Sequence, residues 1–161
     1  MNTAQIRKSL LHGQSPSLRR RRALTWLGAL GLMDSAVMTL YQMGAIHHLP
    51  DPPGFDSDRV VGSRAAYFFG TLDAPLNALA TSATLILAGA GGEPRPPIFD
   101  VLLGGTVVAN AIGAAAYLFD MVAREKRACA YCIPAALISL GMLPFALPEL
   151  RRGWRALHHR R

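Results

Sequence analysis

Apolar residues in this sequence gather into four long stretches separated by shorter polar connections. Each stretch approaches or exceeds the roughly 20 residues that span the hydrocarbon core of a bilayer. They cover residues 23–46, 65–91, 97–123 and 128–147. Hydrocarbon offers the backbone no hydrogen-bond partner, so such stretches must form helices, and short connections make consecutive helices antiparallel neighbours. The pattern predicts an all-α integral membrane protein built as a four-helix bundle.

Polar segments flank and connect the four stretches, which together form one domain over residues 23–147. Residues 1–22 and 148–161 are basic tails. We expect the first tail to be disordered or to lie on the membrane surface, with an interfacial amphipathic helix as the alternative. Residues 47–64 form the longest connection and contain three prolines, which predicts an irregular loop covering one face of the bundle.

The positive charges predict how the bundle is oriented. With the N-terminus inside, twelve Lys and Arg residues fall on the inner side and five on the outer side. The positive-inside rule therefore places both termini in the cytoplasm and the loop of residues 47–64 outside. The net charge of +7 has the same origin, because the basic residues gather in the tails, so it does not indicate a nucleic-acid partner.

Four arginines at residues 19–22 precede the first apolar stretch, which is also the arrangement of a secretory signal. Asp34 interrupts it and no small-residue cleavage site follows, so we interpret it as a retained helix. Trp26 and Trp154 near the inner boundary, and the four tyrosines near the outer one, fit interfacial belts. A short chain without an organelle-targeting leader favours a multi-pass protein of a bacterial cytoplasmic membrane.

The only two cysteines, Cys129 and Cys132, form a C-x-x-C motif at the start of the last apolar stretch. Pro134 fits the first turn of a helix, so both sulfurs are expected at a helix N-terminus, where unpaired N–H groups stabilise a thiolate. A structural disulfide, two inert thiols, or half of a metal site with His47 and His48 are the alternatives. The motif favours thiol–disulfide exchange without a metal, and a quinone is the lipid-soluble carrier suited to accept two electrons there.

Three features of the sequence together resemble the vitamin K epoxide reductase family. They are the four spans, CAYC at residues 129–132 and SDRVVGSRAAYFFG at residues 57–70. The outer loop of that family runs C-x-x-V-x-x-S-R followed closely by F-G. The matching positions are Val60, Ser63, Arg64, Phe69 and Gly70. The resemblance implies a four-helix bundle around a quinone of the menaquinone, ubiquinone or vitamin K type. It also implies that Cys132 faces the quinone and that Cys129 exchanges with other thiols.

The sequence departs from that family in its outer loop, which lacks the cysteine pair. Ser57 stands where the second loop cysteine would be, and the first has no counterpart. An internal cysteine relay is therefore absent, and we expect a thiol partner, such as a thioredoxin-like domain at the outer face, to reduce the Cys129–Cys132 disulfide. Ala136 stands one turn after Cys132, where some members present a tyrosine to the quinone.

Several residues are candidates for quinone contacts. Ser63 matches the family's loop serine near the quinone. Tyr67, Phe69 and Tyr131 are candidates for contact with an aromatic ligand, with an interfacial belt as the alternative. Asn77 shares a helix face with Asp73, four residues earlier, and is expected either to line an outer cavity with Ser63 or to belong to a local polar network.

Polar residues inside membrane spans are functional candidates by default. Asp34 is expected either to relay protons or to pair with another group and hold helices in register. Asn110 is expected to form an interhelical hydrogen bond. Gly105, Ala109 and Gly113, four apart, predict a stripe of small residues for close helix packing.

The sequence thus predicts a quinone-linked thiol–disulfide oxidoreductase in a membrane, with lipid, a quinone and an external thiol protein as partners. The alternative is a non-catalytic membrane binding or scaffold protein derived from the same family, whose main support is the missing loop pair.

Overall fold

A computed structural model describes residues 3–68 and 71–159. Within these residues the regular structure is helical apart from one hairpin of two short strands. The helices are α1 (Thr3–His12), α2 (Pro16–Gln42), α3 (Ser57–Val61), α4 (Asp73–Gly89), α5 (Pro97–Asp120), α6 (Cys132–Gly141) and α7 (Leu143–His158). A 3-10 turn, η1 (Arg64–Ala66), precedes the antiparallel hairpin of β1 (Tyr67–Phe68) and β2 (Thr71–Leu72), and a π-helical turn, η2 (Met121–Glu125), follows α5.

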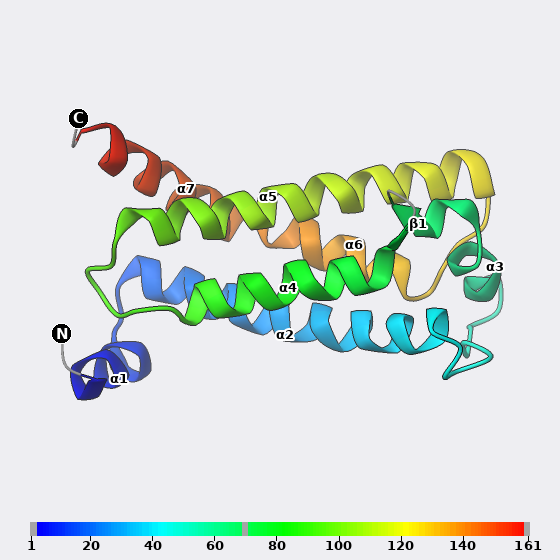
Figure 1. Ribbon diagram of the computed structural model, residues 1–161, viewed down its shortest axis with the longest axis horizontal. Coiled ribbons are helices and arrows are strands. Elements are labelled where there is room, and N and C mark those ends of the chain that lie inside the picture. Colours follow the sequence, from blue (N-terminus) through cyan, green and yellow to red (C-terminus); the bar gives the residue numbers. More distant parts are fainter. Residues whose placement is uncertain (1–2, 69–70, 160–161) are drawn as a thin grey trace.

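The long helices lie lengthwise and close to antiparallel (Figure 1). α2 packs along α4, α5 packs along α7, and α6 continues into α7 to form a fourth rod. Both termini lie at one end of the bundle, which we call the terminal end. α3 and the hairpin lie at the opposite end, which we call the loop end. The expectation that both termini share one side of the bundle therefore agrees with the arrangement.

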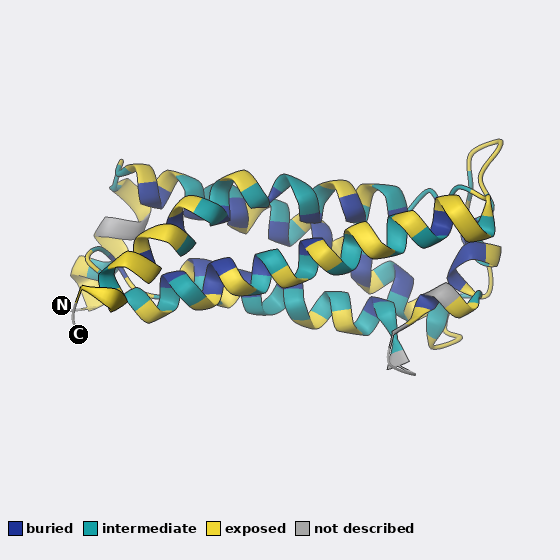
Figure 2. Ribbon diagram, turned by 90° about the horizontal axis from the view of Figure 1, so that it is seen from above, coloured by how far each residue is buried: buried dark blue, intermediate teal, exposed yellow. Residues whose placement is uncertain are grey.

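Three helical segments are long and apolar enough to cross a membrane. They are Pro16–Gln42, Pro97–Glu125 and Cys132–His158. Large apolar side chains remain exposed along the rods, and exposed positions run down the outside of the helices in Figure 2. Examples are Leu79, Ile86, Ile112, Phe119 and Leu137. Side chains of this kind face lipid in a membrane protein, so the fold is that of an all-helical membrane protein.

α4 is shorter than the apolar stretch of residues 65–91 predicted. It contains 17 residues, which at 1.5 Å per residue span about 25 Å, slightly less than a hydrocarbon core. The preceding residues fold into η1 and the hairpin instead, and α4 begins at Asp73 with Pro75 in its first turn. Proline is tolerated there because the first N–H groups of a helix have no intrahelical partner.

The basic N-terminal tail is largely helical rather than disordered, and its place at a membrane surface stays a prediction. α1 covers 10 of its residues, and α2 begins at Pro16, where the hydroxyl of Ser15 accepts a hydrogen bond of 3.2 Å from the N–H of Leu18. Serine at the N-cap and proline at the first position are a strong helix start. Arg21 is buried and donates hydrogen bonds of 2.8–2.9 Å to carbonyls at and just after the end of α4, at Ala88, Ala90 and Gly91.

The predicted stripe of small residues does not pack against another helix. An added Cβ at Gly105 or Gly113 would meet nothing within 4 Å. Close approach occurs one residue away, because a Cβ on Gly104 would lie 2.4 Å from the Cβ of Leu150 on α7. A four-residue spacing identifies a helix face, but it does not say which face meets the neighbour.

Two apolar clusters form the core, one near each end of the bundle. The cluster at the terminal end contains Leu24, Ala88, Leu103, Val107, Met142 and Ala146. The cluster at the loop end contains Met38, Leu49, Val60, Val61, Ala74, Met121 and both cysteines. The long connection of residues 47–64 thus contributes apolar side chains to the core and closes the loop end.

Candidate redox-active site

The two cysteines form a disulfide bond at the loop end. Their sulfurs lie 2.06 Å apart and their Cα atoms 5.2 Å apart. Cys132 is the first residue of α6, and Pro134 lies in its first turn. This is the position at a helix N-terminus that the sequence predicted.

Both cysteines are enclosed by the loop-end cluster. Cys129 is 0% exposed and Cys132 is 4% exposed. Their neighbours include Leu49 and Val60 from the 47–64 connection, and Tyr131 packs against the same cluster. In this arrangement a thiol from another protein has no access to either sulfur.

Two hydrogen-bonding groups meet the sulfurs. The backbone N–H of Cys132 donates to the Sγ atom of Cys129 over 3.0 Å. The hydroxyl of Tyr117, near the end of α5, lies 3.7 Å from the Sγ atom of Cys132. Together with the positive end of α6, the N–H group would stabilise negative charge on a reduced Cys129, and the phenol can exchange a proton at Cys132.

Ser57 ties the outer loop to the segment that carries the cysteines. Its hydroxyl accepts a hydrogen bond of 2.9 Å from the N–H of Ala130. The same hydroxyl donates over 2.5 Å to the carboxylate of Asp51, which also accepts from the N–H of Ser57 over 2.6 Å. Ser57 is 0% exposed. The serine at the position of the missing loop cysteine therefore lies directly beside the C-x-x-C segment.

Further contacts close the loop over the disulfide. The N–H of Asp56 donates over 2.9 Å to the carbonyl of Ala128, and Phe55 pairs with Ala128 as an isolated parallel bridge. The hydroxyl of Tyr131 donates over 3.2 Å to the carbonyl of Pro50. Residues 50–57 thus form a strap across residues 128–131, which we call the disulfide strap.

Asp58 holds the start of the strap in place. Its carboxylate accepts from the N–H of Leu49 over 2.9 Å and contacts Nδ1 of His48. Partial burial by itself would raise the pKa of Asp58, but the hydrogen bonds from Leu49 and His48 favour the carboxylate more strongly, and the pKa of Asp58 is lowered. The carboxylate is therefore the form that fixes the loop.

The predicted quinone contacts are spread over the loop end. Ser63 lies in the turn after α3, where its carbonyl accepts from the N–H of Ala66 over 3.1 Å. Tyr67 is 52% exposed on β1. Phe69 falls outside the described residues. As quinone contacts, these three residues and Tyr131 stay predictions.

Asn77 belongs to a polar network between α2 and α4, which agrees with the second of its two expected roles. Its amide donates over 2.8 Å to the hydroxyl of Ser35. One turn towards the loop end, the amide of Gln42 donates over 2.6 Å to Asp73 and accepts from the N–H of Ala74. Within the described residues, Asn77 does not bond to the segment of the disulfide, so its role as a quinone contact also stays a prediction.

Two polar residues inside the spans differ in their surroundings. The amide of Asn110 donates over 3.1 Å to the hydroxyl of Ser139, which confirms the expected bond between α5 and α6. Asp34 is half-buried and makes no hydrogen bond or ion pair within the described chain, so the structure gives no support to its pairing. No group of three His, Cys, Asp or Glu side chains suited to a metal occurs among the described residues.

Sequence reasoning missed two residues of this site. Asp51 gives no sequence signal, because one aspartate among several in a polar loop is unremarkable until the loop folds back. Tyr117 was placed in the interfacial belt, yet it supplies a phenol beside Cys132. It does so from α5, a different helix from the one that carries Ala136.

Fold and site together define an all-helical membrane protein with a cysteine pair at the start of a membrane helix. A family model for the vitamin K epoxide reductase family matches residues 22–147, and the chain belongs to this family. The match begins within α2, ends within α7 and covers α4, α5, α6 and the disulfide strap in full. Comparison with curated proteins gives no significant match.

Proposed function

We propose that this protein is a quinone-linked thiol–disulfide oxidoreductase. The observation that carries the proposal is the Cys129–Cys132 disulfide at the first turn of α6, with the hydroxyl of Tyr117 beside Cys132. Membership of the vitamin K epoxide reductase family supports a redox function in a membrane. The direction we propose is from a partner's thiols to the disulfide and on to a quinone.

The first half-reaction is a thiol–disulfide exchange. A thiolate of the partner attacks the Sγ atom of Cys129, the bond to Cys132 breaks, and Cys132 leaves as a thiolate. The second thiol of the partner then displaces Cys129. The partner is oxidised to a disulfide, and the pair gains two electrons and two protons. Thiolate character is favoured at Cys129 by the N–H of Cys132 and at Cys132 by the start of α6.

The donor groups around Cys132 suit a quinone. A quinone accepts two electrons and two protons, so its site needs a sulfur that donates electrons and a hydroxyl that exchanges a proton. Cys132 and Tyr117 supply these two groups 3.7 Å apart within an apolar cluster. We propose Ser63, Tyr67, Asn77 and Tyr131 as further contacts of the ring.

The proposal includes an orientation. We infer that all four rods cross the membrane, α4 included, with the terminal end in the cytoplasm and the loop end outside. The arginines of α2 and α7 at the terminal end support this orientation through the positive-inside rule. The membrane would then be a bacterial cytoplasmic membrane, and the partner a thioredoxin-like protein outside it.

Access to the disulfide requires the strap to open. Because Cys129 is 0% exposed, the partner's thiol reaches it only after residues 50–57 separate from residues 128–131. The strap is held by a few hydrogen bonds, each with a net contribution of about 1 kcal/mol. An opening that breaks only these hydrogen bonds is compatible with turnover. The closed strap would keep small oxidants away from the reduced pair.

The test follows quinone absorbance with purified protein and a dithiol reductant. Wild type is expected to form quinol, and Cys132→Ser is expected to form none, because no sulfur remains to pass electrons onward. Cys129→Ser is expected to fail with a protein dithiol as well. Quinol formation that does not depend on Cys132 would exclude the enzyme. Alkylation of reduced Cys129 in intact cells by a membrane-impermeant reagent tests the orientation.

A non-catalytic scaffold is the second candidate, favoured by the burial of both sulfurs beneath the strap. In that case the disulfide would resist reduction by protein dithiols in the folded protein. The same assay separates the two functions, because a scaffold would give neither reduction of the disulfide nor quinol.

A further inference from the structure

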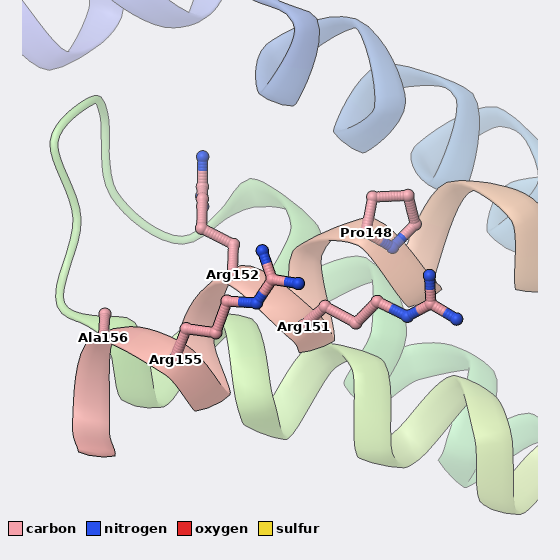
Figure 3. Close-up of a pocket in the computed structure, with 5 residues that line it drawn as sticks. All are labelled: Pro148, Arg151, Arg152, Arg155 and Ala156. Atoms are coloured by element: carbon pink, nitrogen blue, oxygen red, sulfur yellow. The ribbon is translucent and has the colours of Figure 1, made fainter. Parts of the chain in front are cut away.

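The terminal end carries a pocket on α7, far along the bundle from the disulfide (Figure 3). Its volume is about 530 Å³, within the range of ligand sites in proteins. The residues that line it are Pro148, Arg151, Arg152, Arg155 and Ala156. They recur at helical spacing and therefore share one side of α7.

Arg151 and Arg155 lie on the part of this side that faces away from α5, whereas Arg152 reaches back to Asp100. A Cβ added at Gly153 would lie 2.8 Å from the Cβ of Asp100, and one added at Gly104 would lie 2.4 Å from the Cβ of Leu150, so Gly153 and Leu150 form the face that contacts α5. Arg151 and Arg155 are exposed. In Figure 3 their side chains run along α7 towards Pro148, whereas that of Arg152 turns away from them.

Two carboxylates of this end, Glu149 and Asp100, are paired with arginines other than Arg151 and Arg155. Glu149 is paired with Arg20 and Arg152 over 2.8 Å. Asp100 is paired with Arg95 over 2.5 Å and with Arg152 over 2.8 Å. Each of these two carboxylates therefore already has two guanidinium partners.

The guanidinium groups of Arg151 and Arg155 make no hydrogen bond or ion pair within the described chain. They lie one helical turn apart, with Pro148 and Ala156 as apolar neighbours in the pocket. A site with two free guanidinium groups and an apolar wall suits an anion that is attached to an apolar body.

The location selects the kind of anion. The segment Cys132–His158 is apolar enough to cross a membrane, and its arginines begin only after its apolar part, at the level where lipid headgroups lie. Trp154, between the two arginines in sequence, is 57% exposed, as tryptophans of the interface are. Basic pockets at this level bind anionic headgroups.

We propose that Arg151 and Arg155 bind the headgroup phosphate of an anionic phospholipid, with its acyl chains against the apolar residues of the rods. This inference is independent of the redox function. Each arginine near a membrane surface contributes roughly a fivefold gain in affinity for anionic lipid, and the two together about 25-fold.

The test uses quenching of Trp154 by lipids with brominated acyl chains, in a Trp26→Phe background that leaves Trp154 as the only tryptophan. Phosphatidylglycerol and phosphatidylcholine with identical chains are titrated into the detergent-solubilised protein. The background protein is expected to bind phosphatidylglycerol about 25-fold more tightly, and Arg151→Gln/Arg155→Gln is expected to lose that preference. Arg151→Lys/Arg155→Lys, which keeps both charges, is expected to keep most of it.

The matched control is Arg59→Gln/Arg127→Gln, which removes two exposed charges at the loop end. It is expected to keep the preference for phosphatidylglycerol. An equal loss in the control, or an unchanged preference in Arg151→Gln/Arg155→Gln, would overturn the proposal. Displacement of the lipid by inorganic phosphate at comparable concentration would show a site for free phosphate, and this too would overturn it.

Discussion

The hydroxyl of Ser57 accepts a 2.9 Å hydrogen bond from the N–H of Ala130, the residue between the two cysteines that follows Cys129. Ser57 stands where the resemblance to the vitamin K epoxide reductase family would place the second loop cysteine, and it meets the C-x-x-C segment through its hydroxyl. The loop therefore covers the disulfide through hydrogen bonds, and under the proposed function electrons would enter from another protein.

Weakening the disulfide strap is expected to speed reduction of the disulfide. Ser57→Ala removes the acceptor for the N–H of Ala130, and Asp51→Asn removes the charge that orients Ser57. The loss of one hydrogen bond, about 1 kcal/mol, raises the population of the open strap roughly fivefold. The rate of reduction by a water-soluble phosphine, followed by alkylation of the thiols, measures this population.

Ser139→Ala is the matched control for the strap, because Ser139 is also a buried serine that accepts one N–H bond, here from Asn110. Its rate of reduction is expected to equal that of wild type. A strap variant that reduces no faster than this control would show that the strap does not limit access.

Replacement of the phenol beside Cys132 is expected to slow electron transfer to quinone without affecting the disulfide. Tyr117→Phe keeps the ring and removes the hydroxyl 3.7 Å from the Sγ atom of Cys132. Proton transfer by a positioned group contributes about 10²-fold, so quinol formation should fall by this factor. Reduction of the disulfide by phosphine should stay unchanged.

Tyr41→Phe provides the control for Tyr117→Phe, since the hydroxyl of Tyr41 bonds to the carbonyl of Asp58 rather than to a sulfur. Its quinone reduction should match wild type. If both variants lose activity equally, the effect belongs to packing of the loop end and not to the phenol at Cys132.

Acid is expected to release the loop through Asp58. The pKa of Asp58 is lower in the folded protein than in the unfolded chain, where it is about 3.9. Its carboxylate therefore stabilises the loop fully above that value, and the contribution is lost as the pH falls through the lower folded pKa. The protection factor of the Leu49 amide against hydrogen exchange should drop over this acid range.

Asp58→Asn tests the same link at neutral pH. The variant keeps the shape of the side chain but not its charge, so Leu49 should already be weakly protected and should lose little more in acid. An acid-dependent loss of protection as large as in wild type would assign the effect to another group.

Packing between α5 and α7 is expected to depend on Gly104 and not on its neighbour. Gly104→Ala places a Cβ 2.4 Å from the Cβ of Leu150, whereas Gly105→Ala meets nothing within 4 Å. Overpacking of this kind costs about 1–3 kcal/mol, so only Gly104→Ala should lower the midpoint of thermal unfolding in detergent. An equal effect of the two substitutions would contradict this packing.

Local chemistry in the sequence decided much of what the structure contains. The long apolar stretches determined the membrane helices, because in a bilayer the backbone can form hydrogen bonds only with itself. Pro134 determined that a helix starts at the cysteines, because proline suits a first turn. The polar partners of Asn110 could likewise be expected from its place inside a span.

Tertiary contacts decided the rest. Hydrophobic periodicity does not fix how each rod is rotated about its axis or how the loop end folds. That arrangement decides the hairpin that shortens α4, the face of α5 that meets Leu150, and the hydroxyl that approaches Cys132. The strap depends on residues such as Ser57 and Ala130, which are distant in sequence and meet only when the loop folds back. Sequence determined the long helices and the helix start at the sulfurs; the packing of those helices determined the hairpin and the groups that surround the sulfurs, because such contacts join residues whose separation no local pattern encodes.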